Sequence, residues 1–241
     1  MPKQFEERED PRRAFLVKAL ASGLLAAGGL LGSASRARAQ LFGRRPGKLP
    51  AGQSVYEARG AVRINGRPAA RDTIVGADAV IETGDGAQFI FVVGSDAFLM
   101  RENSRLELSG SNMLVNGLRL ATGALLSVFG RGNKQVYAPT STIGIRGTGL
   151  YVESEPERAY VCTCYGETSI AAADDPSISE VIVSRHHDAP RYVYAAGAPQ
   201  RIVPAPFVNH DDLELMLIES LVGRTPPFSL FDEGYGSPRR Y

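Results

Sequence analysis

The sequence lacks a surplus of charge of either sign, and this argues against one large class of partners. Its 241 residues contain 27 Lys and Arg against 26 Asp and Glu. Residues 1–39 hold seven of the basic and four of the acidic residues, so the remainder has 27 − 7 = 20 basic and 26 − 4 = 22 acidic residues. Nucleic-acid binding requires clustered Lys and Arg that neutralise phosphates. We therefore expect no nucleic-acid partner.

The sequence also lacks an apolar run of the roughly 20 residues that a membrane-spanning helix requires. Residues 19–31 are apolar but short and rich in Ala and Gly, and they follow the pair Arg12-Arg13. Small residues, Ala37 and Ala39, stand where a signal peptidase cleaves. Residues 1–39 thus predict a twin-arginine export signal and a periplasmic protein that folds before export. An uncleaved membrane anchor or a buried helix remains the alternative.

The rest of the chain predicts one all-β domain, since 44% apolar content supplies one sizeable core. We expect a flexible leader over 40–53, a β domain over 54–206, one helix over 207–222 with Asn209 as N-cap, and a disordered tail over 223–241. The helix should bury Leu213, Met216, Leu217, Ser220 and Leu221. Short β-branched and aromatic stretches bounded by Gly, Asn or Asp predict strands at 61–64, 74, 80–83, 87–93, 97–101, 104–108, 117–120, 124–129, 134–137, 141–145, 149–153, 160–165, 168–171 and 180–184.

Several of the boundaries between these strands are chemically specific turns. Asn65-Gly66, residues 83–86, Asn116-Gly117 and Gly132-Asn133 supply the residues that adopt positive φ in tight hairpins. We therefore expect antiparallel hairpins at these four places.

Three segments resemble the FecR domain: 60–66 (GAVRING), 74–84 (IVGADAVIETG) and 138–148 (APTSTIGIRGT), the last ending in Arg146-Gly147-Thr148. The resemblance covers about 55–171. It implies stacked short strands in a β-solenoid or roll, a structural role for Arg146, Gly147 and Thr148, and a periplasmic binding or scaffold module that takes part in envelope signalling. The partner would be an envelope protein or a polysaccharide, and the membrane would be met only through an uncleaved signal.

The chain departs from the family's regulators, because only about eighteen residues precede the apolar run and a second signalling lobe is missing. Direct control of a sigma factor and siderophore-receptor signalling are therefore not expected. A small regulator that acts through a membrane partner stays a third hypothesis, and it predicts a retained N-terminus.

Cysteine is scarce, and its two copies stand in one motif, Cys162-Thr163-Cys164. Residues two apart in a strand share a face at about 6.6 Å, which is the outer limit for a disulfide. Such a thiol pair suits Cu or Zn, with His186 and His187 as further ligands, and this predicts a metal-binding or redox-sensing protein as the alternative function. A strained disulfide, a bridge to another chain and plain packing remain open.

The sequence gives little reason to expect an enzyme. A cysteine nucleophile with His186 or His187 as base and Asp188 as orienting group rests on residue types alone. Residues 144–149 lack the Lys-Ser/Thr pair of a phosphate loop. Solvation accounts for the acidic groups around His210. The leading prediction is thus a non-enzymatic binding module without a cofactor, and the alternative is a Cu or Zn site.

Overall fold

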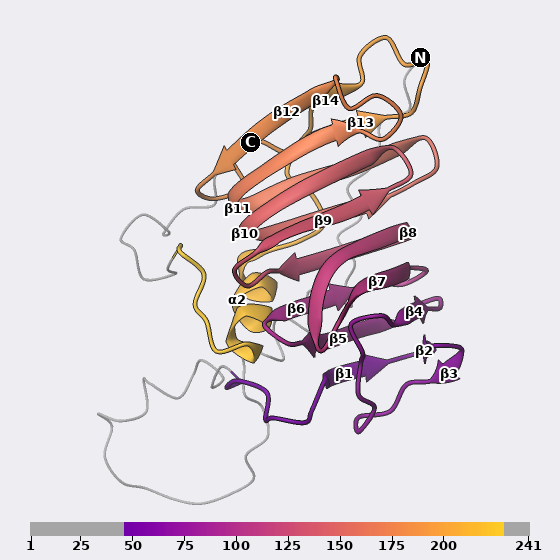
Figure 1. The fold of residues 1–241 in the computed structure, drawn as a ribbon, viewed down its shortest axis with the longest axis vertical. Helices are drawn as coiled ribbons and strands as arrows, with labels where there is room; N and C mark the ends of the chain where they lie inside the picture. The colour runs from indigo at the N-terminus through magenta and orange to yellow at the C-terminus, as the bar shows by residue number, and fades with distance from the viewer. Residues whose placement is uncertain (1–45, 229–241) are drawn as a thin grey trace, which may run out of the picture. The chain divides into compact units, whose positions relative to one another are not determined.

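A computed structural model describes residues 46–228 (Figure 1). The predicted export signal, with Arg12, Arg13, Ala37 and Ala39, lies outside the described residues, as do residues 229–241. The described residues from Gly47 onward belong to one structural unit. Among them no helix is both long enough and apolar enough to cross a membrane.

The predicted all-β class with one C-terminal helix is confirmed. The structure forms strands β1 (Val55–Arg59), β2 (Val62–Ile64), β3 (Arg67–Pro68), β4 (Val80–Thr83), β5 (Gln88–Val93), β6 (Asp96–Met100), β7 (Arg105–Ser111), β8 (Leu114–Val128), β9 (Asn133–Ala138), β10 (Ser141–Ser154), β11 (Arg158–Ala172), β12 (Ser179–Ser184), β13 (Arg191–Tyr194) and β14 (Ile202–Pro204). The helix is α2 (Asp212–Leu221).

All fourteen strands belong to one sheet, in which the order is β14-β13-β11-β10-β9-β8-β7-β4-β2-β3. Strand β6 joins this path through β8, β5 pairs with β6, and β1 pairs with β5. Strands β13 and β12 pair with different parts of β11, β13 with residues 158–161 and β12 with residues 166–171. Every pairing is antiparallel except that of β8 with β9. Figure 1 shows the result as a ladder of strands with α2 lying beside its middle.

The three longest strands each fuse two of the predicted ones. Strands β8, β10 and β11 contain Gly123, Gly147 and Gly166, all with positive φ. These glycines were expected to end strands. In the structure they allow a bend or a shift of register instead, and hydrogen bonding resumes after them.

The predicted turns are partly right. Asn65 and Gly66 have φ of 50° and 76°, and they join β2 to β3 as the sequence predicts. The prediction of a hairpin at Asn116-Gly117 is wrong, because both residues lie inside β8. The turn that leads from β7 into β8 is formed by Asn112 and Met113, with φ of 49° and 62°.

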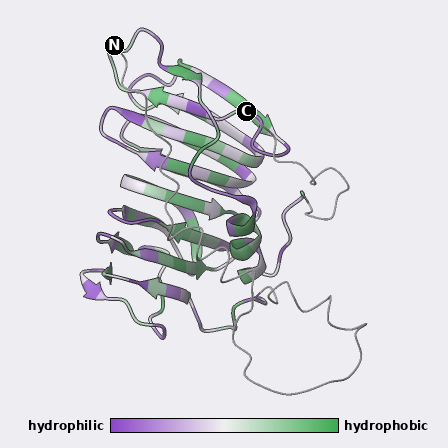
Figure 2. Cartoon of the chain, turned by 180° about the vertical axis from the view of Figure 1, so that it is seen from behind, coloured by the Kyte–Doolittle hydropathy of each residue, from purple (hydrophilic) through white to green (hydrophobic). Residues whose placement is uncertain are grey.

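The sheet buries side chains on both faces. Adjacent residues of β10 show this, because Leu150 and Val152 pack into a large inner core, whereas Tyr151 between them points to an outer layer beneath α2. Strands β5 and β6 are buried along nearly their whole length. Figure 2 accordingly shows more continuous hydrophobic colouring along the strands near α2 than along β12.

Helix α2 begins later than the sequence predicts. Its N-cap is Asp211, whose carboxylate accepts from the Glu214 backbone N–H while the Glu214 side chain accepts from the Asp211 backbone N–H. The predicted N-cap, Asn209, has a φ of 60° outside the helix. The predicted buried face is right in part, because Met216 and Leu221 are buried whereas Leu213 is 42% exposed. Leu215 and Ile218, which the sequence does not place on this face, are enclosed as well.

The segment before α2, residues 205–211, is not helical, and we call it the strap. It crosses the outer layer, where Phe207 and Val208 pack against buried apolar side chains. After α2, Arg224 forms an ion pair with Glu219, and Phe228 is 8% exposed. Residues 223–228 belong to the predicted disordered tail, and in the structure Phe228 packs on the outer layer.

Candidate metal centre

Strand β11 places Cys162 and Cys164 side by side. Because side chains alternate along a strand, residues two apart point to one face, and both cysteines here point into the outer layer. Both are 0% exposed, and both are free thiols. Their neighbours in this layer include Tyr160 and Ile218.

A tight turn after β12 brings His187 to the cysteines. The Asp188 carboxylate accepts from the backbone N–H groups of Arg185 and His186, which closes the turn. His187 has a φ of 53° and donates its backbone N–H to the Cys164 carbonyl at 2.9 Å. Its Nδ1 then lies 3.4 Å from Cys162 Sγ. A side chain held at positive φ is uncommon and marks a position worth functional scrutiny.

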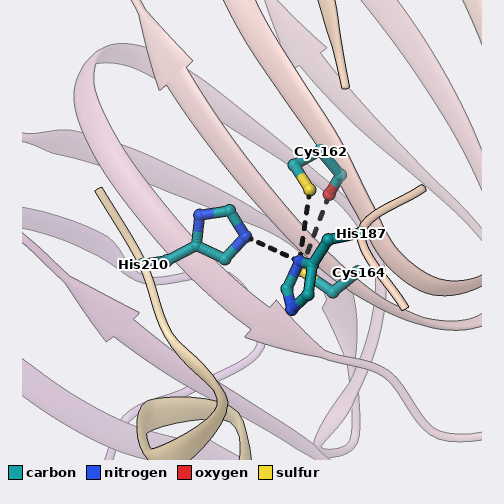
Figure 3. A group of neighbouring side chains, drawn as sticks. All are labelled: Cys162, Cys164, His187 and His210. Carbon is teal, nitrogen blue, oxygen red and sulfur yellow. Dashed lines mark hydrogen bonds between the residues drawn. The ribbon is translucent and has the colours of Figure 1, made fainter. Parts of the chain in front are cut away.

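The strap supplies His210. The ring of His210 stacks on Tyr151 with centroids 4.4 Å apart, and its Nδ1 lies 2.7 Å from the Val208 carbonyl oxygen. Its Nε2 points to His187 Nδ1 at 3.1 Å (Figure 3). His210 is 2% exposed.

These four side chains form what we call the Cys/His cluster: Cys162, Cys164, His187 and His210. One ligand atom from each lies within 4.8 Å of all the others. Tetrahedral bonds of about 2.0 to 2.3 Å to one ion would place such atoms about 3.3 to 3.8 Å apart. The observed 3.4 Å and 3.1 Å contacts are already close to this spacing.

Each imidazole of the cluster has an inner nitrogen, which faces the other cluster members, and an outer nitrogen, which faces away from them. Hydrogen bonds at the outer nitrogens set the tautomers of both imidazoles. His187 Nε2 faces the Asp212 carboxylate at 3.2 Å, and His210 Nδ1 faces a carbonyl oxygen. Both oxygens only accept, so each of these nitrogens carries a hydrogen. If both rings are neutral, the two inner nitrogens turn lone pairs toward each other across 3.1 Å. A proton or a cation between them removes that repulsion.

Electrostatics within the cluster favour ionised groups. Burial opposes ionisation of Cys162, but hydrogen bonds from Cys164, His187 and His210 outweigh it and lower the pKa of this thiol. Burial and the neighbouring Cys162 raise the pKa of Cys164. Burial lowers the pKa of His187, but Asp212 and Cys162 outweigh it and raise this pKa to about 9. The two shifts act in the same direction, because both favour a thiolate at Cys162 beside an imidazolium at His187.

Asp212 supports the cluster from the first turn of α2. Its Oδ1 lies 2.8 Å from His186 Nε2 as well as 3.2 Å from His187 Nε2. Burial raises the pKa of Asp212, but these two hydrogen bonds outweigh it, and the pKa is lowered overall. A carboxylate on the outer nitrogen of a histidine is the usual support of a metal-binding imidazole.

The structure brings together three of the four residues that the sequence singled out. Cys162, Cys164 and His187 meet, whereas His186 points to Asp212 at the rim. The fourth member, His210, was missed, since it was interpreted as part of a solvated acidic segment. A signal was available, because the chain contains only two cysteines and three histidines. All five lie in this one region.

The segment that resembles the end of the FecR motif lies elsewhere. Arg146, Gly147 and Thr148 form the register shift in the middle of β10, where Gly147 has a φ of 56°. Thr148 is buried and donates to the Glu167 carbonyl at 3.4 Å, and Arg146 forms an exposed ion pair with Glu167. The motif thus interrupts the regular pairing of β10 with β11.

The fold and the cluster define a class: an all-β protein with a buried Cys₂His₂ group of metal-ligand type. No protein-family model matches the sequence, and no curated protein matches it either. Among solved structures the chain is similar to a putative anti-sigma factor from Parabacteroides distasonis ATCC 8503, seen in two crystal structures. In both the TM-score is 0.43 with 9% identity, over 52% of this chain and 58% of that one. The match thus spans little more than half of that protein, and a likeness of this size says nothing about function.

Proposed function

We propose that this protein binds one divalent transition-metal ion of the zinc class in the Cys/His cluster. The observation that carries the proposal is the convergence of both cysteines and two of the three histidines of the chain, all buried, within 4.8 Å. Two thiolates and two imidazoles around one point are the ligand set of tetrahedral zinc sites.

Charge favours a divalent ion over Cu(I). Two thiolates carry two negative charges, and a divalent cation neutralises them, whereas Cu(I) would leave one negative charge. Every member of the cluster is at most 5% exposed, and a net charge is costly in such surroundings. Asp212 is already engaged by two histidines, and the ion pairs of Arg101 and Arg224 go to Glu214 and Glu219.

The proposed role is structural rather than catalytic. Catalytic zinc keeps one position for water or substrate, whereas four protein ligands close the coordination sphere. The two surface pockets described, of about 400 and 490 Å³, share Tyr56 and Arg71 and include no member of the cluster.

Metal analysis of the exported chain, purified without chelators, tests the proposal. We expect close to one equivalent of a divalent metal, mainly zinc. Replacement by Co(II) should give the intense visible bands of a tetrahedral thiolate site. The substitutions Cys164→Ser and His210→Ala should each abolish these bands.

Substitution of the adjacent histidines provides the matched control, since His186, His187 and Asp212 form a second group that could hold an ion. His187→Ala should lose the metal, whereas His186→Ala should retain it. Less than about a tenth of an equivalent in the unaltered chain overturns the proposal. Retention in Cys164→Ser with loss in His186→Ala also overturns it, because the ion would then occupy the second group.

A second candidate function is a non-enzymatic binding module of the cell envelope, and the exposed edge of the sheet favours it. Within the described residues β12 pairs only with β11. Its Val181 and Val183 are 61% and 70% exposed. An exposed apolar edge strand is suited to pair with a strand of another protein. A polysaccharide is the other partner that this function allows.

Two measurements test this second function. Photo-crosslinking from position 183 in intact cells should yield one defined adduct, and Val181→Lys should abolish it. Intact-mass analysis should show a chain that begins at Gln40. A chain that retains Met1 would contradict the proposed periplasmic location and favour a membrane-anchored regulator.

A further inference from the structure

The proposed metal centre has a consequence for the C-terminal part of the chain, and the inference rests on the proposed function. We infer that the bound ion is a latch, which holds the strap and α2 on the outer face of the sheet and releases them when the ion is lost. The metal state would then control how much of the apolar outer layer is covered.

The ligands come from three segments that are far apart in the sequence. Cys162 and Cys164 lie in the centre of β11, His187 follows β12, and His210 lies in the strap (Figure 3). Of the four ligands, His210 is the one that joins the C-terminal segment to the sheet. An ion shared by all four side chains therefore links this segment to the middle of the sheet.

Asp212 extends the link into the helix. It is the first residue of α2, and its carboxylate accepts from His187 Nε2. The N-cap Asp211 lies between His210 and Asp212 and closes the capping box with Glu214. The first turn of α2 is thus joined to the cluster both through the chain and through a side chain.

The helix depends on its packing against the sheet for its order. It has ten residues, and isolated helices shorter than about 12 to 15 residues are marginal in water. Its order therefore comes from packing Leu215, Ile218 and Leu221 on the outer layer. Without the ion, His210 keeps only its 3.1 Å contact with His187 and its stacking on Tyr151, so the strap loses the tie that a shared ion would provide.

Other polar contacts also hold the strap and α2. The Ala205 N–H donates to the Pro190 carbonyl at 2.9 Å, the Val208 N–H donates to the Tyr160 hydroxyl oxygen at 3.3 Å, and the Tyr165 hydroxyl donates to Glu219. Arg101 binds the Glu214 carboxylate at 2.7 Å and the Asn209 carbonyl at 3.0 Å. The Asn209 side chain donates to Glu153 at 2.7 Å. Glu214 provides a control, because its substitution weakens the docking of α2 without removing a ligand.

Hydrogen exchange measured by mass spectrometry tests the latch on the full exported chain, with zinc and after chelation. We expect removal of the ion to accelerate exchange in residues 205–221 by at least about tenfold. Exchange in β4 and β7, which pair with each other away from the cluster, should not change. Glu214→Gln should retain the metal, accelerate exchange of α2 moderately, and remain sensitive to chelation.

The outcomes separate the two proposals. If no ion binds, the proposed function fails and the latch fails with it. If an ion binds but its removal leaves residues 205–221 unchanged, or accelerates the whole sheet equally, the latch is overturned while the metal site stands. If Glu214→Gln alone produces the full acceleration and chelation adds nothing, the ion pair holds the helix, and the latch is again overturned.

Discussion

Two buried polar groups in this protein differ in how far the chain itself satisfies them. The first is the ion pair of Lys134 and Asp96, which are 6% and 1% exposed and lie 2.8 Å apart. Lys134 Nζ also donates to the Val115 carbonyl, and Asp96 Oδ1 accepts from the Gly130 backbone N–H, both at 2.8 Å. Donors meet acceptors throughout, so this pair is complete within the chain.

The Cys/His cluster is of similar burial but is not complete in the same way. Its outer nitrogens are bonded to Asp212 and to the Val208 carbonyl, whereas its inner nitrogens and both sulfurs point to one another. Four atoms that bind metals therefore share one small volume. Burial of polar groups alone therefore does not indicate a site, whereas convergence of their lone pairs does.

Removal of the proposed ion should have the largest effect. A ligand present at about 1,000 times its dissociation constant stabilises the folded state by about 4 kcal/mol, which for a chain of this size is about 8 to 16 °C in midpoint temperature. Chelation should lower the thermal midpoint of the unaltered chain by this amount. His210→Ala should show no response to chelator, and a full response in that variant would place the ion elsewhere.

Loss of the Lys134–Asp96 ion pair should lower the stability by an amount close to that of ion removal, but it should leave the response to chelator intact. Asp96→Ala leaves a buried ammonium without its partner, and we expect a loss of about 3 to 5 kcal/mol in urea unfolding. The double substitution Asp96→Ala with Lys134→Met should recover most of this loss. The response to chelator should persist in both variants, since neither residue belongs to the cluster. A loss below about 1 kcal/mol for Asp96→Ala would show that the pair is hydrated.

Two glycines of β10 test how tightly the outer layer is packed beside the cluster. A Cβ at Gly149 would lie 2.5 Å from the Tyr165 ring, whereas one at Gly144 would lie 3.8 Å from Ser169. Gly149→Ala should cost about 1 to 3 kcal/mol in urea unfolding because the ring must move. Gly144→Ala should be neutral or stabilise by about 0.5 kcal/mol. Equal effects of the two substitutions would contradict the packing described for Tyr165.

The smallest expected effect is the pH dependence of an ion pair that belongs to neither buried group. The Arg191 guanidinium lowers the pKa of the Glu180 carboxyl, to which it donates at 2.6 and 2.7 Å. A carboxyl whose pKa is lowered by folding stabilises the fold above its unfolded pKa of about 4.3, and this contribution is lost as the pH falls through the folded pKa.

Because Glu180 is 40% exposed, its contribution should stay below about 1 kcal/mol. Arg191→Met should therefore flatten the stability profile slightly below pH 5 and leave the chelator response intact. If Arg191→Met leaves the dependence of stability on pH unaltered, the ion pair of Glu180 and Arg191 contributes no stability in solution.

Local sequence rules worked best where a few neighbouring residues decide the structure. Asn65-Gly66 forms the predicted hairpin because two adjacent residues with positive φ suffice for that turn. Asn116-Gly117 has the same chemistry but lies inside β8, where pairing with β7 and β9 on either side outweighs the local preference. The start of α2 was misplaced because Asn209 and Asp211 are both good N-caps, and only the capping box formed with Glu214 selects one of them.

For the candidate site, the sequence determined that Cys162 and Cys164 share a face, because a strand repeats every two residues. It also supplied the whole stock of cysteine and histidine from which a site could be built. Only the tertiary structure decided that His187 rather than His186 turns inward, and that His210 joins from 46 residues beyond Cys164. The reason is physical: alternation along a strand is a local property, whereas the meeting of β11, the turn after β12 and the strap depends on how the sheet and α2 pack around a shared apolar layer.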